Sequence, residues 1–321
     1  MKTLVTGATG FIGSHLVEEL LRKGYSVTCL VRKTSDLQWI EGLDISLAYG
    51  DCTEKESLLN AVTGFDYIFH LAGLTKARNE KDFFLANTSG TENLIQAVAE
   101  KNPNIKRFVY LSSLAAAGPC YDRTPVSEAV EPRPVSAYGK SKLEAERIVL
   151  RHKDVIPLTI IRPPAVYGPR DKDMYTFFKM LKKGIFLCWG KCYYSLLYVD
   201  DLVRGTIISS ENNAAEGKIY YLSDGKIYSN DEIAEAISSA VGTKPVRLRI
   251  PRVIMPLFAG IGQRLGGKRN IINKDKIKEL QHPYWVCDSS KAREELGFVP
   301  KVGIKEGIKW TADWYRIHQW L

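Results

Sequence analysis

The sequence predicts an α/β fold, in which a doubly wound parallel sheet is covered by helices on both faces and joined to a smaller, mostly helical C-terminal lobe. Short apolar runs alternate with longer amphipathic ones, which indicates βαβ units whose strands are buried on both faces. After Arg162 this alternation gives way to Pro-rich and Gly-rich segments and to helical stretches such as NDEIAEAISSAV and SSKAREEL. The expected strands are KTLVT, SVTCLV, SLAYG, DYIFHLA, RFVYLSS and LTIIR, and the first amphipathic run is FIGSHLVEELLRK.

A chain of 321 residues exceeds the usual size of a single core, so we expect two unequal lobes. Residues 1–165 are expected to form the sheet domain. The chain is expected to return to this domain near 195–225, where YSLLYVDDLVRG is a candidate segment. Residues 166–321 are expected to form mainly a substrate-binding lobe. Ligands of open α/β sheets bind at the carboxyl ends of the strands, so functional residues are expected there.

The composition is that of an ordinary globular protein, with 45% hydrophobic and 25% charged residues. No apolar run approaches the roughly 18 residues needed to cross a bilayer. The first residues form a strand pattern and not a signal peptide, so we expect a cytoplasmic protein. Six cysteines are scattered without the close Cys and His spacing of a zinc site, so we expect reduced thiols and no bound metal.

A glycine-rich loop follows the first expected strand, in TGATGFIGSHL. Gly7, Gly10 and Gly13 stand where a strand turns into a helix. A tight turn, a close approach of the backbone to a pyrophosphate and close helix-on-strand packing each exclude a side chain. The helix N-terminus then offers free amides and a positive dipole end to phosphates. The loop therefore predicts a dinucleotide-binding Rossmann fold.

The residues after the second and third strands bear on which dinucleotide binds. Such folds place an acidic residue about 20 residues beyond the loop to hold the ribose hydroxyls, or an Arg that accepts a 2′-phosphate. Here SVTCLV is followed by Arg32 and Lys33, which favours NADP over NAD; the alternative is a solvated pair of cations. Asp51 is expected either at the adenine edge or as the cap of a helix over TEKESLLNAV.

A candidate catalytic group lies in VSAYGKSKLEAE, where Tyr138 and Lys142 are four residues apart in a stretch of good helix formers and so face the same way. A nearby ammonium lowers the pKa of a tyrosine by stabilising the phenolate, which suits acid–base catalysis. The strand RFVYLSS ends in Ser112 and Ser113, and we expect Ser113 to donate to a substrate carbonyl oxygen. Alternatively, both serines only bond loop amides at a strand end.

Together these motifs resemble the extended short-chain dehydrogenase/reductase family, which includes nucleotide-sugar epimerases and dehydratases, dihydroflavonol reductases and 3β-hydroxysteroid dehydrogenases. The resemblance runs nearly end to end, through TGATGFIG, HLAG, NTSGTENL, LSSLAAAG, YGKSK, RPPAVYGP, YVDDLV and REELGFVP. It implies a homodimer, with Tyr138 as acid/base, Lys142 as its partner and nicotinamide-ribose ligand, and Ser113 as carbonyl donor. Ser113 is preferred because it stands five residues before Gly118. The further cofactor contacts that the resemblance implies are Thr6, Phe11, Ile12, Cys52, Leu71, Ala72, Gly73 and Pro163.

Two departures from the sugar-nucleotide members of that family indicate a less polar substrate. Those enzymes commonly carry an Asn three residues after the strand-ending Arg, where it touches the substrate diphosphate. Here Ala165 occupies that place, after Pro163 and Pro164. They also tend to have Tyr where this chain has Ala117, which leaves room and removes a polar contact. We therefore expect hydride transfer between NADP(H) and a ketone or secondary alcohol.

Two other functions stay open. A nucleotide-sugar epimerase with tightly bound NAD is the main alternative. A dehydratase fits less well, because Leu114 and Ala115 stand where its extra acid/base pair is typically found. A non-enzymatic dinucleotide sensor fits least, because such proteins generally lose the Tyr or the Lys of the active pair.

Residues 250–269, IPRVIMPLFAGIGQRLGGKR, combine apolar residues at helical spacing with basic ends. They could cover an apolar substrate, touch anionic lipid, or bind an acyl group whose carrier bears phosphates. Alternatively, they form a core-packing helix with solvated basic flanks. Nucleic acid is not expected as a partner, since no stacking aromatics or binding motif accompany the charge. The apolar positions are Val253, Ile254, Leu257, Phe258 and Ile261.

Overall fold

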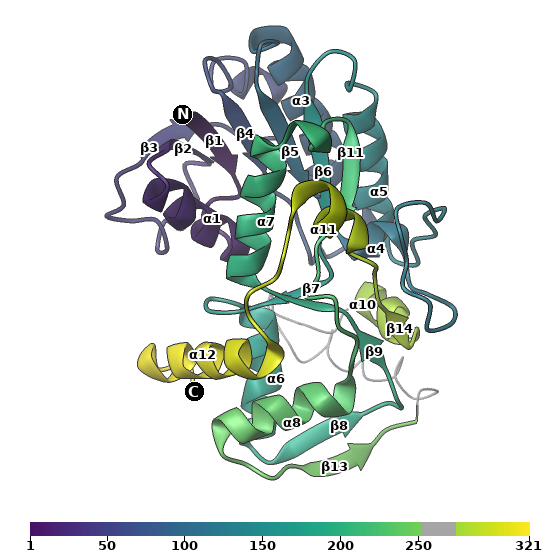
Figure 1. Ribbon diagram of the computed structural model, residues 1–321. Coiled ribbons are helices and arrows are strands. Elements are labelled where there is room, and N and C mark those ends of the chain that lie inside the picture. Colours follow the sequence, from purple (N-terminus) through teal and green to yellow (C-terminus); the bar gives the residue numbers. More distant parts are fainter. Residues whose placement is uncertain (252–273) are drawn as a thin grey trace.

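The structure is a computed structural model that describes residues 1–251 and 274–321. Seven strands form the central sheet: β1 (Lys2–Thr6), β2 (Ser26–Val31), β3 (Ser46–Tyr49), β4 (Tyr67–His70), β5 (Arg107–Leu111), β6 (Leu158–Arg162) and β11 (Lys218–Tyr221). Their order is β11-β6-β5-β4-β1-β2-β3, and every neighbouring pair is parallel (Figure 1). The order runs outward from β1 in both directions, which confirms the predicted doubly wound fold class.

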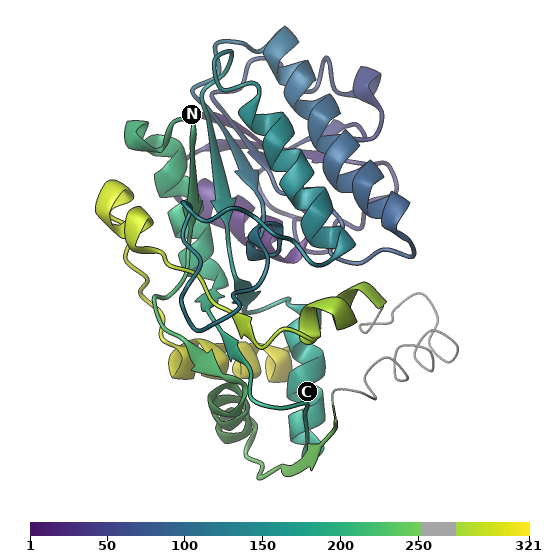
Figure 2. The same ribbon diagram turned by 90° about the vertical axis from the view of Figure 1, so that its right-hand side faces the viewer.

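Helices cover both faces of this sheet (Figures 1 and 2). On one face α1 (Phe11–Arg22) packs beside α7 (Val199–Glu211), and on the other α3 (Gly90–Lys101) packs beside α5 (Ala137–Leu150). Alternate residues of each strand enter the two resulting cores, as expected for strands buried on both sides. Val5, Phe69, Val109 and Ile161 face the first core, and Leu4, Ile68, Phe108 and Ile160 face the second.

The chain returns to the central sheet later than the candidate segment YSLLYVDDLVRG suggested. Its apolar half forms β9 (Tyr193–Tyr194) and β10 (Leu196–Tyr198), and β10 pairs with β7 (Ala165–Tyr167) in a separate small sheet. A strand that lies parallel to β6 needs a crossover connection before it. Because α7 supplies that crossover, the strand after it, β11, takes the sheet edge.

The lower lobe combines helices with small sheets (Figure 1). β8 pairs with β13, and β9 lies between β12 and β14. The elements of this lobe and of its junction with the sheet are α6 (Lys172–Lys182), β8 (Ile185–Cys188), β12 (Tyr228–Ser229), α8 (Asn230–Val241), β13 (Val246–Arg249), α10 (Lys274–Leu280), β14 (Tyr284–Trp285) and α12 (Ile304–Ile317). Short helices in the connections are η1 (Lys55–Ser57), α2 (Glu80–Phe83), the π-helix η2 (Phe84–Ser89), α4 (Leu114–Ala117), η3 (Asn213–Ala215) and α11 (Ser290–Leu296).

Two expected helices differ from the prediction. SSKAREEL forms α11, but this helix packs on β11 of the upper lobe and not within the lower lobe. TEKESLLNAV forms only the 3₁₀ turn η1 at Lys55–Ser57. There the Ser57 hydroxyl donates to the carbonyls of Asp51 (3.1 Å) and Glu54 (2.7 Å). Such side-chain bonds to the local backbone compete with continued helix.

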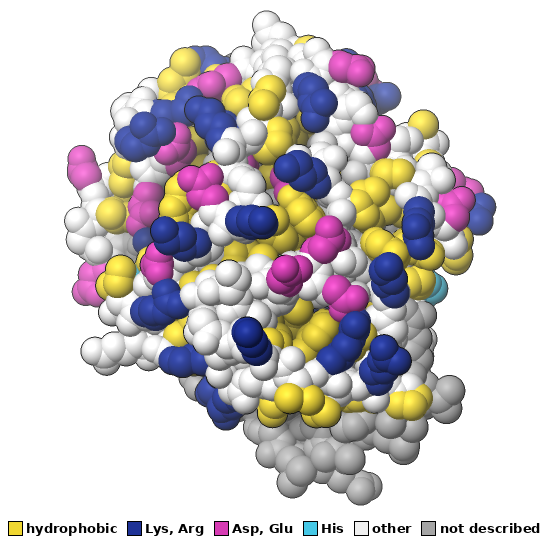
Figure 3. Space-filling view, turned by 60° about the horizontal axis from the view of Figure 1, so that its bottom comes forward, with side chains coloured by type: hydrophobic (Ala, Val, Ile, Leu, Met, Phe, Trp, Pro, Cys, Tyr) yellow, Lys and Arg dark blue, Asp and Glu magenta, His cyan; other side chains and the backbone are white. Residues whose placement is uncertain are grey.

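The predicted basic and apolar segment lies, from residue 252 onward, outside the described residues. This includes the whole apolar stripe from Val253 to Ile261. Over the described part of the lower face, basic side chains are interspersed with acidic ones (Figure 3). Within residues 1–251 and 274–321, no helix combines the length and apolar character that spanning a membrane requires.

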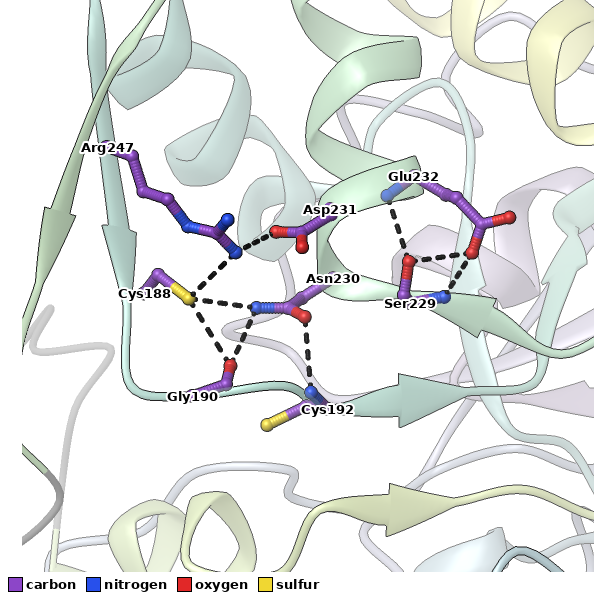
Figure 4. Close-up of polar contacts among 8 residues, drawn as sticks. All are labelled: Cys188, Gly190, Cys192, Ser229, Asn230, Asp231, Glu232 and Arg247. Atoms are coloured by element: carbon purple, nitrogen blue, oxygen red, sulfur yellow. Dashed lines mark hydrogen bonds and ion pairs between the residues drawn. The ribbon is translucent and has the colours of Figure 1, made fainter.

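A polar cluster ties β8, β13 and the start of α8 together (Figure 4). Arg247 Nη2 donates to the Asp231 carboxylate and to Cys188 Sγ, which is 3.4 Å away. Asn230 Nδ2 donates to the same sulfur (3.4 Å) and to the Gly190 carbonyl (3.0 Å). Arg247, one of the basic residues near the predicted surface segment, therefore has a structural partner on α8.

A buried ion pair joins α5 to the sheet. Arg162 donates through Nε and Nη2 to the two carboxylate oxygens of Glu146, at 2.9 and 2.6 Å. The two side chains are only 3% and 1% exposed. Arg162 Nη1 also donates to Tyr221 Oη on β11 (2.9 Å), and the Ser112 hydroxyl donates to Glu146. Since a bidentate pair fixes both orientation and depth, it sets the register of α5 against β5 and β6.

Glu146→Ala is expected to lower the free energy of unfolding by about 3–5 kcal/mol, because it leaves the Arg162 guanidinium buried without its carboxylate. Urea denaturation followed by circular dichroism measures the loss. Glu144→Ala is the matched control: this residue lies on the same helix, 40% exposed and paired with Arg147, and its loss should cost less than about 1 kcal/mol. Equal losses in the two variants would contradict the structural role of the pair.

Candidate active site

The glycine loop between β1 and α1 passes too close to its neighbours to carry side chains. A Cβ on Gly13 would lie 2.1 Å from the Gly7 carbonyl oxygen, and one on Gly7 would lie 2.7 Å from Ala72 N. Gly7 also has a φ of +74°, which favours glycine. α1 then begins at Phe11 with no capping side chain and no acidic residue in its first turn. Its first amides and positive dipole end are thus left for an anion.

These features fit the phosphates of a dinucleotide. Gly10 N donates to the Gly7 carbonyl at 3.0 Å, which closes the turn ahead of α1. The Phe11 ring packs on His15, with 5.7 Å between centroids, and Ile12 packs against the core. The structure therefore gathers the predicted residues Thr6, Gly7, Gly10, Phe11, Ile12 and Gly13 at the carboxyl end of β1.

The segment Leu71–Gly73, after β4, lies directly beside this loop. Leu71 N donates to the Thr6 carbonyl and Ala72 N to Thr6 Oγ1, both at 3.2 Å. His70 Nδ1 lies 2.7 Å from the same Thr6 hydroxyl. Burial lowers the pKa of His70 to about 3, so its ring is neutral and acts only as a hydrogen-bonding partner of its neighbours. The predicted cofactor residues that follow β1 and β4 therefore lie side by side along one side of the candidate site.

The carboxyl ends of β2 and β3 carry the other predicted cofactor residues. Arg32 and Lys33 are exposed, and Arg32 Nη1 lies 4.0 Å from Asp51 Oδ2. Asp51 Oδ1 accepts from Thr53 N (2.9 Å) and Thr53 Oγ1 (2.8 Å), so Asp51 closes a turn and does not cap a longer helix. Burial raises the pKa of the neighbouring Cys52 thiol to about 12. A cation and a carboxylate therefore face each other at this end of the site.

The structure brings the two predicted catalytic hydroxyls together. Tyr138 is the second residue of α5, and Ser113 directly precedes α4. Ser113 Oγ accepts from Ala115 N at 3.1 Å, and hydrogen bonding by the Ser113 side chain lowers the pKa of the Tyr138 phenol. The Tyr138 ring packs against Phe83, with 5.9 Å between centroids. Two hydroxyls therefore converge beside the dinucleotide loop.

Ser112 has a different environment from Ser113. Its side chain is buried and its hydroxyl donates to Glu146, within the network that holds α5 to the sheet. The preference for Ser113 over Ser112 is consistent with these contacts, because the Ser112 hydroxyl is engaged by Glu146 and the Ser113 side chain acts on the Tyr138 phenol.

Lys142 lies one turn beyond Tyr138, but its ammonium has another partner. Nζ donates to the Leu111 carbonyl at 2.7 Å and sits 4.2 Å from the centroid of the Tyr110 ring. Burial lowers the pKa of Lys142 to about 7, against the opposing effect of the Glu146 charge. Within the described residues, this ammonium is directed to the end of β5 and not to the Tyr138 phenol.

The pKa of Tyr138 is therefore shifted in the opposite direction to the sequence prediction. Burial raises it to about 12; the hydrogen bond from Ser113 lowers it, and the charge of Glu279 raises it. The expected lowering by Lys142 is absent among these causes, because that ammonium bonds to Leu111. A phenol in this setting is protonated at neutral pH.

Asn87, which was not among the predicted site residues, lies close to the candidate site. It lies in the π-helix η2 with 1% of its surface exposed. Its Oδ1 accepts from Leu74 N (2.7 Å), and its Nδ2 donates to Leu74 O (3.0 Å) and Ser141 Oγ (2.9 Å). Ser141 Oγ in turn donates to the Tyr138 carbonyl at 2.7 Å. The signal was present as a polar NTS run inside a buried helix, and π-helical turns are frequent at functional sites.

The residues that departed from the sugar-nucleotide pattern lie in different surroundings. Ala165 is exposed at the start of β7. Ala117 is only 5% exposed and packs in an apolar cluster with Cys120, so the room predicted there is filled by protein. The Pro163 carbonyl accepts from Leu114 N at 2.8 Å and so joins the end of β6 to α4.

Comparison with known proteins agrees with this arrangement. Residues 3–223 match the NAD dependent epimerase/dehydratase family. A ceramide reductase from Caulobacter vibrioides is 28% identical over 324 residues, covering 99% of this chain and 95% of the relative. A UDP-glucose 4-epimerase from Vibrio cholerae is 28% identical over 328 residues, covering 97% of this chain and 94% of the relative. The crystal structure of gox2253 has a TM-score of 0.83 at 27% identity, with 99% of each chain covered.

The matched region spans the whole central sheet, and full-length relatives include both a reductase and an epimerase. The resemblance found in the sequence motifs is thereby confirmed, and the protein belongs to the NAD dependent epimerase/dehydratase family and is an NAD(P)-dependent enzyme.

Proposed function

We propose that this enzyme uses NADPH to reduce the ketone of a largely apolar substrate to a secondary alcohol. The observation that carries the proposal is that Ser113, which follows β5, and Tyr138 of α5 lie close enough for the Ser113 side chain to act on the Tyr138 phenol, at the end of the sheet to which the glycine loop turns. Two hydroxyls aimed at one point stabilise negative charge as it develops on a carbonyl oxygen. When bound, the nicotinamide cofactor supplies the hydride, which carries two electrons to the carbonyl carbon.

Tyr138 is proposed to give its phenolic proton to the carbonyl oxygen while the new C–H bond forms. Its raised pKa of about 12 keeps the phenol protonated at neutral pH, as a proton donor needs to be. Ser113 donates a hydrogen bond to the same oxygen. A proton from solvent then restores the phenol, so that one hydride and one proton are added to the ketone in each turnover.

Lys142 is proposed to bind the nicotinamide ribose. Its ammonium lies at the end of β5, bonded to the carbonyl of Leu111, two residues before Ser113. This is the end of the sheet to which the glycine loop also turns. A ribose hydroxyl bound at this end of the sheet could replace the Leu111 carbonyl as the partner of Lys142.

The preference for NADP is supported by the end of β2. Arg32 is 65% exposed, and the nearest carboxylate, Asp51, is 4.0 Å away with its other oxygen held by Thr53. A guanidinium in this position can bind a 2′-phosphate through two parallel hydrogen bonds. We therefore propose NADP as the working cofactor, with Lys33 adding positive charge.

The apolar character of the substrate is supported by Ala165 and by one of the relatives. Ala165 offers an exposed methyl group at the place where sugar-nucleotide enzymes commonly carry Asn. The full-length relative from Caulobacter vibrioides carries the name ceramide reductase. Contact of the 250–269 segment with a membrane or an acyl carrier, a homodimer and a cytoplasmic location stay predictions.

Epimerisation of a nucleotide sugar is the second candidate function. The equally identical UDP-glucose 4-epimerase from Vibrio cholerae favours it. An epimerase keeps one NAD bound through the whole cycle, whereas a reductase exchanges its cofactor at each turnover. The two functions therefore differ in how tightly the purified protein holds its nucleotide.

Tyr138→Phe is expected to lower kcat for ketone reduction by roughly 10²- to 10⁴-fold with little change in KM, because the ring stays in place and only the proton donor is removed. Steady-state oxidation of NADPH measures both constants. Tyr121→Phe, on a tyrosine that is 69% exposed, is the matched control and should behave as wild type. A Tyr138→Phe variant with undiminished kcat would refute the proposed role of the phenol.

Arg32→Asp is expected to weaken NADPH binding by roughly 100-fold while NADH binding changes little, because a charge-assisted contact to the 2′-phosphate is replaced by repulsion. Fluorescence titration with each nucleotide gives the dissociation constants. Arg22→Asp is the matched control, with the same change of charge on a residue that is 73% exposed on α1. Equal NADPH affinity in wild type and Arg32→Asp would show that this cation does not select the cofactor.

A further inference from the structure

The N-terminus of α5, where Tyr138 lies, is capped by a residue from far along the chain. Asp275 Oδ1 accepts from Ala137 N at 2.6 Å, and Asp275 Oδ2 accepts from Tyr138 N at 3.1 Å. Asp275 is 138 residues from Ala137 in sequence and belongs to α10. Both views place α10 at the junction of the two lobes (Figures 1 and 2). One carboxylate thus satisfies the first two amides of the helix that carries the proposed proton donor.

A second acid of α10 holds the residue that caps the third amide. Ser136 Oγ accepts from Gly139 N at 3.0 Å and donates to Glu279 Oε1 at 2.8 Å. Both side chains are buried, with 1% of Ser136 and 8% of Glu279 exposed. Lys276, one turn earlier on α10, pairs with the other oxygen of Glu279 at 2.8 Å. The whole first turn of α5 is therefore bonded, directly or through Ser136, to α10.

The opposite side of α10 is attached to the lower lobe. Ile277 is 5% exposed and packs with Leu280 and with Trp189, which follows β8. Trp285 of β14 donates through Nε1 to the Glu279 carbonyl at 3.0 Å. α10 therefore connects the lower lobe to the N-terminus of α5, and the position of α10 depends on its contacts with both.

We propose that Asp275 and Glu279 are positioning residues for Tyr138: Asp275 fixes where the phenol lies relative to Ser113, and Glu279 holds the Ser136 cap in place and adds negative charge at this end of α5. The inference rests on the proposed role of Tyr138 as proton donor. The N-cap Ser136 satisfies only the third amide of α5, and the first two amides bond a carboxylate on another element, so the position of this terminus depends on α10. A displacement of a reacting group by about 1 Å can lower the rate 10²-fold, so the position of α10 becomes a determinant of turnover.

The electrostatic part of the proposal involves few groups. Hydrogen bonding by Ser113, directly before α4, lowers the pKa of Tyr138, and Phe83 on α2 contributes an uncharged ring. On α10, the charge of Glu279 raises that pKa, the Asp275 carboxylate accepts from Tyr138 N, and the Lys276 ammonium pairs with Glu279. On α5 itself, the Lys142 ammonium is directed to the Leu111 carbonyl and lies over the Tyr110 ring. The Tyr110 hydroxyl is buried and its pKa is raised well above the ordinary value, so it is uncharged. Removing the charge of Glu279 should therefore lower the pKa of Tyr138.

Asp275→Asn tests the positional part. Asparagine keeps one oxygen acceptor but turns an amide donor towards a backbone N–H. We expect kcat for ketone reduction to fall roughly tenfold with KM nearly unchanged, because reactive geometry and not binding is disturbed. Hydrogen exchange of the peptide spanning 136–143, followed by mass spectrometry, should become faster.

Asp288→Asn is the matched control, since it removes a carboxylate that accepts from Ser290 N at the start of α11, away from α5. It should change neither the exchange of 136–143 nor kcat. Wild-type exchange and wild-type kcat in Asp275→Asn would overturn the positional role. So would a loss of kcat of the same size in Asp288→Asn.

Glu279→Gln tests the electrostatic part and remains informative if Asp275→Asn fails to fold. Glutamine keeps an acceptor for the Ser136 hydroxyl and removes the charge. In the reverse reaction, alcohol oxidation, kcat rises with pH while Tyr138 acts as the base. On this rising limb Glu279→Gln should have a higher kcat than wild type at the same pH. An equal or lower kcat throughout the limb would overturn the role of Glu279.

The Tyr138→Phe variant separates this inference from the proposed function. If it keeps full activity, the proposed function fails, and hydrogen exchange still shows whether Asp275 holds the first turn of α5. If it is inactive while Asp275→Asn and Glu279→Gln behave as wild type, the proposed function stands and the positioning inference fails.

Discussion

The buried pair of Glu146 and Arg162 is the interaction on which the rest of the site depends. Two charged side chains that are only 1% and 3% exposed need each other's hydrogen bonds to offset the loss of contact with water. The bidentate contacts at 2.6 and 2.9 Å supply these bonds. Because Glu146 lies on α5 and Arg162 ends β6, helix and sheet are locked in one register. Lys142 and Tyr138 stand one and two turns before Glu146 on the same helix. The ion pair therefore sets how far along the sheet these two residues lie, near the carboxyl ends of the strands.

The site is then assembled from short connections that close packing holds in place. The glycine loop contacts the segment Leu71–Gly73, and Asn87 ties the next residue, Leu74, to α5 through Ser141. At the N-terminus of α5, the Asp275 carboxylate of α10 accepts hydrogen bonds from the first two amides of the helix. Proposed cofactor loop, proton donor and lower lobe are therefore connected by hydrogen bonds between buried groups. Such networks are rigid when every member is satisfied.

Features encoded over short spacings could be predicted from the sequence, and features that depend on distant partners could not. The glycine loop was predictable because each of its glycines stands where local packing leaves no room for a side chain. That Tyr138 and Lys142 lie on the same side of α5 follows from their spacing of four residues in a helix. The direction of the Lys142 ammonium was not predictable, because the Leu111 carbonyl reaches it only in the folded sheet; the predicted lowering of the Tyr138 pKa failed for this reason. The return to the sheet near 195–225 was predicted, but the candidate segment YSLLYVDDLVRG pairs with β7 at residues 196–198, and β11 at 218–221 takes the sheet edge. No local pattern marks Asp275 as a cap for a helix 138 residues away.

The central claim is net reduction of an apolar ketone, and the transfer of deuterium from cofactor to product tests it most directly. The enzyme would be incubated with NADPH deuterated at the transferring C4 position and a panel of long-chain apolar ketones, with nucleotide content and product followed by mass spectrometry. The account predicts protein without a permanently bound nucleotide, and an alcohol that carries one deuterium at the former carbonyl carbon. Protein that retains one NAD per chain, leaves the deuterium on NADPH and interconverts UDP-sugars would contradict it.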